Sequence, residues 1–358
     1  MRYKEDPLFA DERRRHPALT LFLLLLFTVL ALTLVLNHIN NSRVNLLTET
    51  VTVPTLPSHL ENYRILHISD LHGLWFGADQ SRLRDALSSA RYNVVCITGD
   101  VTGKDGDYSA FLSLIDLFDT EKTPVYFIPG DEDPAALAST GEGSPLADYI
   151  RAAEQHGAHY LDAPVRVVEG KVSLWLSPEW AYTLDVTGLE EQYQEYISEF
   201  ASQPPSPERD SAVAYWENQL DRVNRIRSAR REMLEGDVQV ALTHHPLQLS
   251  ALQTLQEWTS TENDSYVRTV SLVLSGHYVG GQWRLPFLGA VRVPDSAETG
   301  NGGWFPEDRR VTGLSSFLGI PQYISPGLGT SAAIGLPPFR LFNTPSVTVL
   351  TLTTRLTH

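Results

Sequence analysis

Short apolar runs that recur along the chain constrain its fold more than any other feature. They are rich in Val and Ile and bounded by Gly or Pro, which is typical of buried strands. The runs span residues 63–69, 93–98, 124–129, 238–243 and 270–275. Helical stretches separate the early runs, at residues 79–90, 108–118 and 145–156. Alternation of strands and helices predicts an α/β fold.

The rest of the chain adds further elements to this pattern. Residues 165–176 predict a hairpin, and residues 322–325 and 346–352 predict two late strands. Residues 180–235 are polar and then helical, and we interpret them as a helical insertion over the core domain. Residues 294–313 are rich in Gly and Asp and predict a surface loop.

The N-terminal segment predicts a membrane anchor. Residues 18–36 carry no charge, and a helix of that length rises about 30 Å, which is close to the thickness of a bilayer's hydrocarbon core. Basic residues stand before it, at Arg13, Arg14 and Arg15, so the positive-inside rule places the N-terminus in the cytoplasm. We therefore expect a single-pass protein of the cell membrane whose domain is extracytoplasmic. Its expected parts are a cytoplasmic tail (1–17), a transmembrane helix (18–36), a polar stem (37–58) and the α/β domain (59–358).

A cleaved signal peptide is the alternative interpretation of the same segment. Signal peptides have shorter apolar regions and end in small residues at the cleavage site. Here the apolar run is followed by Asn37-His38-Ile39-Asn40-Asn41, which is not such a site. The sequence therefore favours an anchor that is not cleaved.

Composition excludes some classes of function. The formal net charge is -15, and an acidic surface repels the phosphate backbone, so we expect no nucleic-acid partner. Cys96 is the only cysteine, so no disulfide forms within the chain, and no cysteine cluster is available to bind zinc.

Polar residues with ligand chemistry follow each of the five apolar runs. Asp70 and His72 are two residues apart after the first run, so their side chains are able to point to one side. The other runs end in Gly99-Asp100, Gly130-Asp131-Glu132-Asp133, His244-His245-Pro246 and Gly276-His277. Strands of an open α/β sheet gather such groups at one edge. Carboxylates packed this closely repel each other without a cation, and carboxylates with imidazoles suit divalent metals. The set therefore predicts a metal site.

In this order the motifs resemble those of the calcineurin-like metallophosphoesterase superfamily, whose pattern is D-x-H, G-D, G-N-H-[DE], H-x-P and G-H-x-H. Residues 280–287 and 325–331 resemble its membrane-associated, YkuE-like phosphodiesterase branch. The resemblance implies a four-layer α-β-β-α sandwich with one or two divalent ions of Mn, Fe or Zn. It implies that Asp70 and His72 bind the first metal and that Asp100 bridges both. The second metal would be bound by Asp131, His244 and His277.

The implied activity is hydrolysis of a phosphomonoester or phosphodiester, including one linked to a lipid, by a metal-activated hydroxide. Three positions depart from the family pattern. Asp131 replaces an asparagine and still offers an oxygen. Glu132 replaces a histidine near the leaving group, and we predict it as the catalytic proton donor. Val279 replaces the last histidine, so the first metal loses one ligand.

These departures leave two functions open. The first is a membrane-anchored phosphoesterase, because the two-metal mechanism tolerates some variation among ligands. The alternative is a catalytically degenerate member that acts as a binding or scaffold protein and holds one metal or none. The number of metals bound per chain distinguishes the two.

Overall fold

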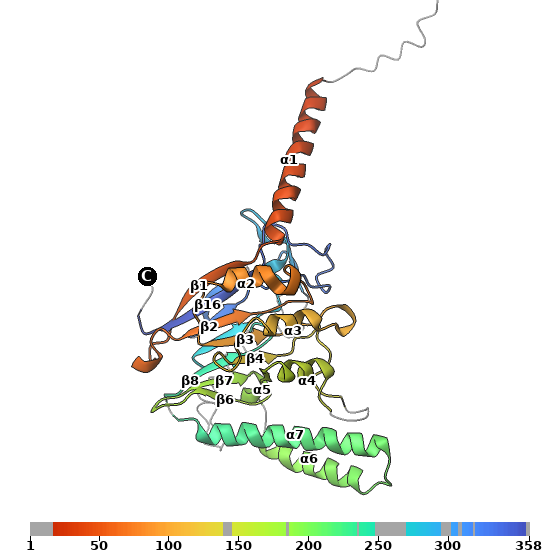
Figure 1. The fold of residues 1–358 in the computed structure, drawn as a ribbon, viewed down its shortest axis with the longest axis vertical. Helices are drawn as coiled ribbons and strands as arrows, with labels where there is room; N and C mark the ends of the chain where they lie inside the picture. The colour runs from red at the N-terminus through yellow and green to blue at the C-terminus, as the bar shows by residue number, and fades with distance from the viewer. Residues whose placement is uncertain are drawn as a thin grey trace, which may run out of the picture.

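A computed structural model describes residues 17–138, 145–183, 186–234, 236–247, 270–294, 302–306, 310–317 and 319–355. Helix α1 (Pro17–Asn41) projects from a body built on two six-stranded sheets (Figure 1). Among the described residues, α1 is the one helix that is long and apolar enough to cross a membrane, a test that signal sequences also pass.

The first sheet has the strand order β1–β16–β2–β3–β4–β5. Strands β2 to β5 pair in parallel, so their carboxyl ends lie at one edge, whereas β16 runs antiparallel to β2 and parallel to β1. The strands are β1 (Asn45–Thr52), β2 (Arg64–Ile68), β3 (Val94–Thr98), β4 (Val125–Ile128), β5 (Ala158–Tyr160) and β16 (Ser346–Thr353).

The second sheet has the order β14–β15–β9–β8–β7–β6. Its four central strands are parallel, and its two edge strands are antiparallel to their neighbours. The strands are β6 (Val165–Val168), β7 (Leu174–Pro178), β8 (Val238–Leu242), β9 (Leu272–Ser275), β14 (Gly313–Phe317) and β15 (Ile320–Ile324). Two small ribbons follow β9 and pair β10 (Arg284–Leu285) with β11 (Gly289–Ala290) and β12 (Arg292–Val293) with β13 (Gly303–Trp304).

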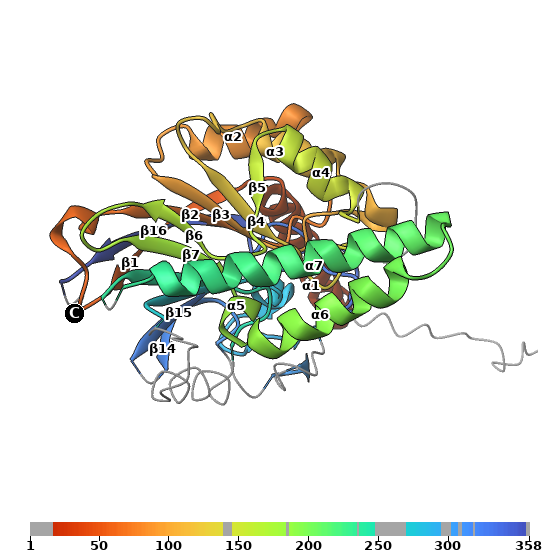
Figure 2. The ribbon, with the colours of Figure 1, turned by 90° about the horizontal axis from the view of Figure 1, so that it is seen from below.

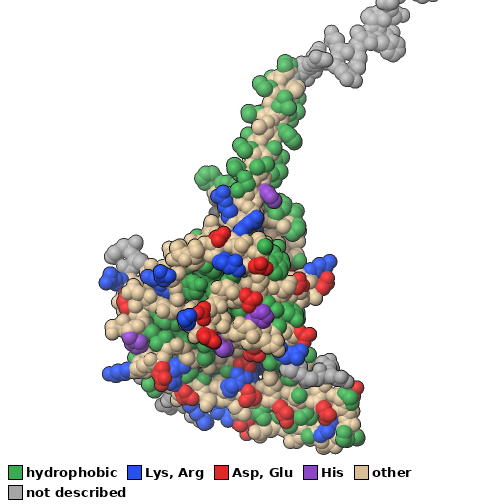
Figure 3. Space-filling view, viewed as in Figure 1, with side chains coloured by type: hydrophobic (Ala, Val, Ile, Leu, Met, Phe, Trp, Pro, Cys, Tyr) green, Lys and Arg blue, Asp and Glu red, His purple; other side chains and the backbone are tan. Residues whose placement is uncertain are grey.

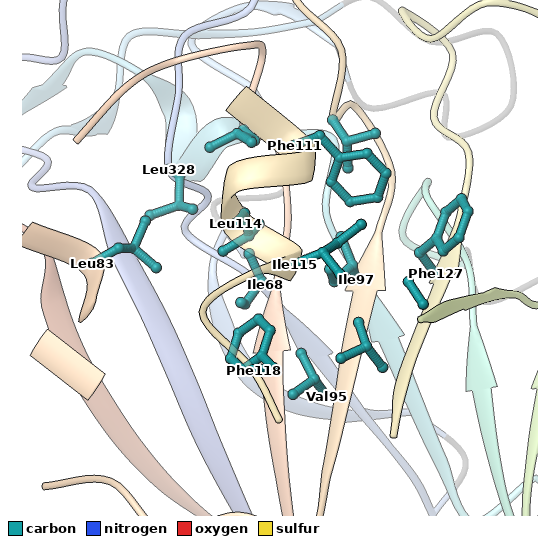
Figure 4. Close-up of a cluster of buried hydrophobic side chains, with 14 of the residues drawn as sticks. Ile68, Leu83, Val95, Ile97, Phe111, Leu114, Ile115, Phe118, Phe127 and Leu328 are labelled. Carbon is teal, nitrogen blue, oxygen red and sulfur yellow. The ribbon is translucent and has the colours of Figure 1, made fainter. Parts of the chain in front are cut away.

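Strand β3 shows how the sequence builds the layers. All of its residues are buried, and successive side chains point to opposite faces of the sheet. Val95 and Ile97 pack against the side chains of the helices that cover the first sheet, including Phe111 of α3 (Figure 4). Val94 and Cys96 face the other way, into the core between the two sheets. A strand that is apolar on both faces therefore specifies a central position with a layer on each side.

Helices flank the two sheets. Figure 2 shows α2 (Ser81–Leu87), α3 (Ser109–Ile115) and α4 (Asp148–Gln155) on one side, and α6 and α7 away from them. The segment expected as a helical insertion contains α5 (Trp180–Thr183), α6 (Val186–Ala201) and α7 (Pro207–Glu232). Ser206 caps α7 by accepting the backbone N–H of Arg209. Short 3-10 turns lie at Ser58–Leu60, Ala78–Gln80, Lys104–Gly106 and Val279–Gly281.

The α/β sandwich and the apolar N-terminal helix expected from the sequence are confirmed. Residues 37–58 differ from the separate polar stem that the sequence predicts. Helix α1 continues to Asn41, and β1 pairs with β16 along its whole length, from Asn45 to Thr52. Only Val51 of β1 is fully buried, because β1 is an edge strand, and this polar character hid the strand in the sequence. Parts of the loop expected at residues 294–313 lie outside the described residues.

Truncation of the core between the sheets tests this architecture. We expect Leu174→Ala to lower the free energy of unfolding by about 2–5 kcal/mol, because Leu174 is fully buried between the sheets. The matched control is Leu234→Ala, since Leu234 is 56% exposed and should change stability little. Denaturant unfolding of the full chain in detergent measures both, and equal losses would contradict this packing.

Candidate metal centre

The strand-end residues of both sheets meet at one edge of the sandwich. The first sheet contributes the residues that follow β2, β3 and β4, and the second sheet contributes those that follow β8 and β9. The residues brought together in this way are Asp70, His72, Asp100, Asp131, Glu132, His244, His245 and His277. All six sequence-predicted metal ligands are among them.

The backbone at this edge is forced into unusual conformations. Asp70, His72 and Asp100 have φ angles of 53°, 46° and 53°, in the left-handed region that few non-glycine residues adopt. A Cβ atom on Gly130 would lie 2.1 Å from the Oδ1 atom of Asp100, so only glycine fits there. Gly130 therefore leaves the space that the Asp100 carboxylate occupies.

Asp131 collects imidazoles from the second sheet. Its Oδ1 atom lies 2.8 Å from Nε2 of His244 and 3.3 Å from Nδ1 of His277. Its Oδ2 atom lies 3.8 Å from Nε2 of His245. Sequence reasoning assigned no role to His245, because the family pattern H-x-P places its ligand at His244 and leaves the next position unspecified. Both histidines come after β8 has ended.

Asp100 lies between two groups of side chains. Its Oδ2 atom is 3.2 Å from Nε2 of His244 and 3.6 Å from Nε2 of His72. Asp70, Asp100 and His244 form one group whose ligand atoms lie within 4.8 Å of each other, and His72, Asp100 and Glu132 form another. This central position fits the bridging role that the resemblance implies for Asp100.

Hydrogen bonds to the backbone orient two of these side chains. The Nδ1 atom of His244 donates to the carbonyl oxygen of Thr98 at 2.8 Å, which turns Nε2 toward the carboxylates. The backbone N–H of His277 donates to Oδ1 of Asp70 at 2.9 Å and joins the two sheets across the site. These hydrogen bonds orient the side chains of His244 and Asp70 at the site.

Some ring nitrogens of the cluster suit a cation. The Nε2 atoms of His72 and His277 are buried and have no hydrogen-bond partner among the described residues. Burying a polar atom without a partner costs about 1–3 kcal/mol, so such atoms call for an explanation. A metal ion accepts a lone pair from each of these atoms, and the mixed nitrogen and oxygen donors suit a divalent metal of the first transition row.

Electrostatics at the site point the same way. Burial raises the pKa of Asp70, and the nearby Asp100 carboxylate adds to this. Burial lowers the pKa of His244, but Asp100, Asp131 and Asp70 outweigh burial and raise that pKa well above its usual value. Burial raises the pKa of Asp131, but the three neighbouring imidazoles lower it far below its usual range. The carboxylates together therefore create a strong local demand for positive charge.

Asp133 is a supporting residue that ties two of the loops together. One of its oxygens, Oδ1, accepts the backbone N–H groups of Val101 (2.9 Å) and Thr102 (2.8 Å) and the Thr102 hydroxyl. The other oxygen, Oδ2, accepts the backbone N–H of Gly130 at 2.9 Å. The acidic position of the third motif thus holds the loop after β3 against the loop after β4.

Arg340 supports the loop beside Asp70 and was missed by sequence reasoning, because nothing in the sequence marks an arginine as buried. Its side chain is fully buried and donates to the carbonyl oxygens of Pro326, Gly329 and Asn343. Burial lowers the pKa of Arg340 to about 9, and Asp70 opposes this shift. The backbone N–H of Gly329 donates in turn to the carbonyl oxygen of Asp70 at 2.6 Å.

The protein is an α/β sandwich with a candidate metal centre. Carboxylates and imidazoles lie at the edge where the strands of both sheets end. A model of the calcineurin-like phosphoesterase family matches residues 63–280, more than half of the chain. The chain belongs to this family.

Comparisons with individual proteins add little to the family match. A search of curated proteins finds no significant match. Among solved structures, the chain is similar to a phosphopantetheinyl hydrolase from Mycobacterium tuberculosis, with 12% sequence identity and a TM-score of 0.34. The similarity covers 75% of this chain and 91% of that chain.

Replacing Asp133 by asparagine tests its supporting role. The new amide has one acceptor oxygen and one NH₂ group. The backbone N–H of Gly130, or those of Val101 and Thr102, would therefore face the NH₂ group, which cannot accept a hydrogen bond. We expect the free energy of unfolding to fall by about 1–3 kcal/mol in thermal or denaturant unfolding. Asp148→Asn is the control, because Asp148 is exposed. An unchanged stability of Asp133→Asn would refute the supporting role.

Proposed function

We propose that this chain is a membrane-anchored, metal-dependent phosphoesterase that hydrolyses a phosphomonoester or phosphodiester. The observation that carries the proposal is the convergence of carboxylates and imidazoles from both sheets in a chain of the calcineurin-like phosphoesterase family. The proposed ligands are Asp70, His72, Asp100, Asp131, His244 and His277. One or two ions of Mn, Fe or Zn are the proposed cofactors.

When bound, divalent ions supply charge that offsets a phosphate ester and lowers the pKa of water near them. The protein's own groups do the positioning. Asp100 lies between the two groups of ligands, and Thr98 fixes the ring of His244. His245 is half-buried beside Asp131, so substrate in solvent reaches this imidazole more easily than the buried His244 and His277. The proton-donor role of Glu132 stays a prediction.

The foot of α1 supports the proposal of an uncleaved anchor. Asn37 and Asn41, in its last turn, both donate to the carbonyl oxygen of Arg340, at 2.6 and 2.7 Å. The N–H groups of Arg340 and Phe342 donate back to Asn41 and Asn37. We call these four hydrogen bonds the α1 clasp. The last turn of the helix is thereby part of the domain, whereas the rest of α1 is exposed and apolar.

Exposed apolar side chains beside this foot support a position close to the membrane. Phe287, at the tip of the β10–β11 hairpin, is fully exposed, and Leu288 and Phe342 are more than half exposed. At the base of the hairpin, the backbone N–H of Arg284 donates to the carbonyl oxygen of Leu341, which is next to the α1 clasp. Figure 1 shows a cyan loop beside the lower end of α1, and Figure 3 shows an apolar α1 above a body with scattered charges.

A catalytic edge near the membrane supports a lipid-linked phosphate ester as the substrate and a place in the YkuE-like branch. The proposed orientation is that predicted by the basic residues before α1, with the N-terminus cytoplasmic and the domain extracytoplasmic. The hydrogen bonds from Arg340 to Pro326 and Gly329 connect the α1 clasp with the loop beside Asp70. A substrate held in the adjacent leaflet would therefore have a short path to the metal centre.

A scaffold or binding protein with a degenerate centre is the second candidate. The observation that favours it is Val279, which is fully buried and offers no ligand where the family has a histidine. This candidate predicts at most one metal per chain and binding of phosphate esters without turnover.

Hydrolysis by the full chain in lipid nanodiscs with Mn²⁺ tests the proposed function. We expect turnover of an aryl phosphate or a bis-aryl phosphodiester, its loss with a chelator, and a loss of about 100-fold or more in Asp100→Asn. Asp119→Asn is the control, since Asp119 is exposed and pairs with Lys122. A folded wild-type chain that is inactive with every divalent metal and both substrates would support the scaffold instead.

A fluorescent probe at the hairpin tip tests the position at the membrane. Cys96 is fully buried, so an introduced cysteine in Phe287→Cys is selectively labelled. We expect bilayer contact to shift the emission of the probe to the blue and brominated lipids to quench it. Glu121→Cys is the control, because Glu121 lies on an exposed turn before β4. Equal quenching at the two positions, or none at Phe287→Cys, would exclude this contact.

A further inference from the structure

We propose that Glu132 is a ligand of the first metal. It would take over the role of the family's last histidine, whose position is occupied by Val279 in this chain. The inference rests on the proposed function, because it concerns the same metal centre. It assigns Glu132 a different role from the proton donor that the sequence predicts.

The distances among three side chains carry this inference. The ring of His72 lies between two carboxylates, with Nε2 at 3.6 Å from Oδ2 of Asp100 and Nδ1 at 3.7 Å from Oε2 of Glu132. These separations are longer than hydrogen bonds. The two separations involve different ring nitrogens, so the common site rests on the closeness of one ligand atom from each residue, since atoms bonded to one metal at about 2.1 Å lie roughly 3–4 Å apart. One potential ligand atom from each residue lies within 4.8 Å of the other two.

A second observation comes from His72 itself. Its side chain is only 7% exposed, and its Nε2 atom has no hydrogen-bond partner among the described residues. A buried imidazole with an unsatisfied nitrogen between two carboxylates is costly as it stands. A cation among the three groups satisfies the nitrogen and offsets the charge of both carboxylates.

Local hydrogen bonds hold Glu132 in place. The hydroxyl of Ser331 donates to Oε1 of Glu132, which leaves Oε2 on the side of His72. The backbone N–H of Glu132 donates to Oδ1 of Asp100 at 2.9 Å. The backbone N–H of Ala333 donates to the Ser331 hydroxyl at 3.1 Å, which fixes its direction. Supporting hydrogen bonds of this kind are typical of ligating carboxylates.

The exchange changes the chemistry of the first metal. A neutral imidazole is lost at Val279 and a carboxylate is gained at Glu132, so the ligands become Asp70, Asp100 and Glu132 with a single imidazole, that of His72. Carboxylate oxygens suit harder cations, and an added negative charge strengthens binding of a divalent ion. We therefore expect the first site to bind Mn²⁺ more tightly, relative to Zn²⁺, than a site with a second imidazole in place of Glu132 would.

Metal binding by the full chain in detergent tests the proposal without reference to activity. The chain is stripped with a chelator, titrated with Mn²⁺, and analysed by elemental analysis and electron paramagnetic resonance. We expect two Mn²⁺ per wild-type chain with a spin-coupled signal. We expect Glu132→Ala and Glu132→Gln each to retain one Mn²⁺ with an uncoupled signal and to bind the other about 100-fold or more weakly.

Two further variants sharpen the comparison. Ser331→Ala should keep two metals but bind the first more weakly, by about 10-fold, because it frees the Glu132 carboxylate without removing it. Glu121→Gln is the matched control, since it removes a carboxylate from an exposed turn and should change nothing. Thermal unfolding confirms that each variant is folded.

The outcomes separate the alternatives. Two equally tight metals in both Glu132 variants would overturn the proposal. Loss in Glu132→Ala with full retention in Glu132→Gln would also overturn it, because glutamine keeps the shape of the side chain and an oxygen that accepts hydrogen bonds but is a poor ligand. A wild-type chain that binds no metal would reject the proposed function itself, whereas a failure confined to the Glu132 variants would leave that function intact.

Discussion

Mutual repulsion among buried carboxylates is the constraint on which the rest of this structure depends. Asp70 and Asp100 are almost wholly buried, and they lie within reach of Asp131 through shared imidazoles. Bringing these charges together in a buried site costs free energy. The glycine turns, the hydrogen bonds of Asp133 and the buried Arg340 all hold the loops that carry these charges. The rare backbone conformations at the edge are part of the same cost.

Sequence reasoning found the α/β fold and most of the site because both follow from strand geometry. The apolar runs and the polar residues after each of them are local signals that predicted ligand groups at one sheet edge, whereas the four-layer sandwich was implied by the family resemblance. The edge strand β1 was missed because only Val51 in it is fully buried. Arg340 and His245 were missed because their roles depend on residues distant in sequence, which no local pattern reveals.

Distances also change the meaning of the two altered motifs. In the sequence, Glu132 and Val279 are separate departures from the family pattern, and each suggests a lost function. In the structure, Glu132 lies beside His72, so one departure is able to compensate for the other. Loss of a ligand from one loop and gain from another leaves the number of ligands unchanged while the charge of the site becomes more negative. Such a centre is altered rather than degenerate, which weakens the motif argument for a scaffold.

Helix α1 and the candidate metal centre share a support, and this bears on what α1 does. Asn37 and Asn41 bond to the backbone of Arg340, whose side chain holds the loop that donates to the carbonyl oxygen of Asp70. A tether alone would need none of these bonds, since a flexible linker keeps a domain at a membrane equally well. The α1 clasp instead limits how the domain can turn about the helix. Arg340 is thus hydrogen-bonded to the foot of the helix directly and linked to Asp70 through Gly329, so one residue connects the two.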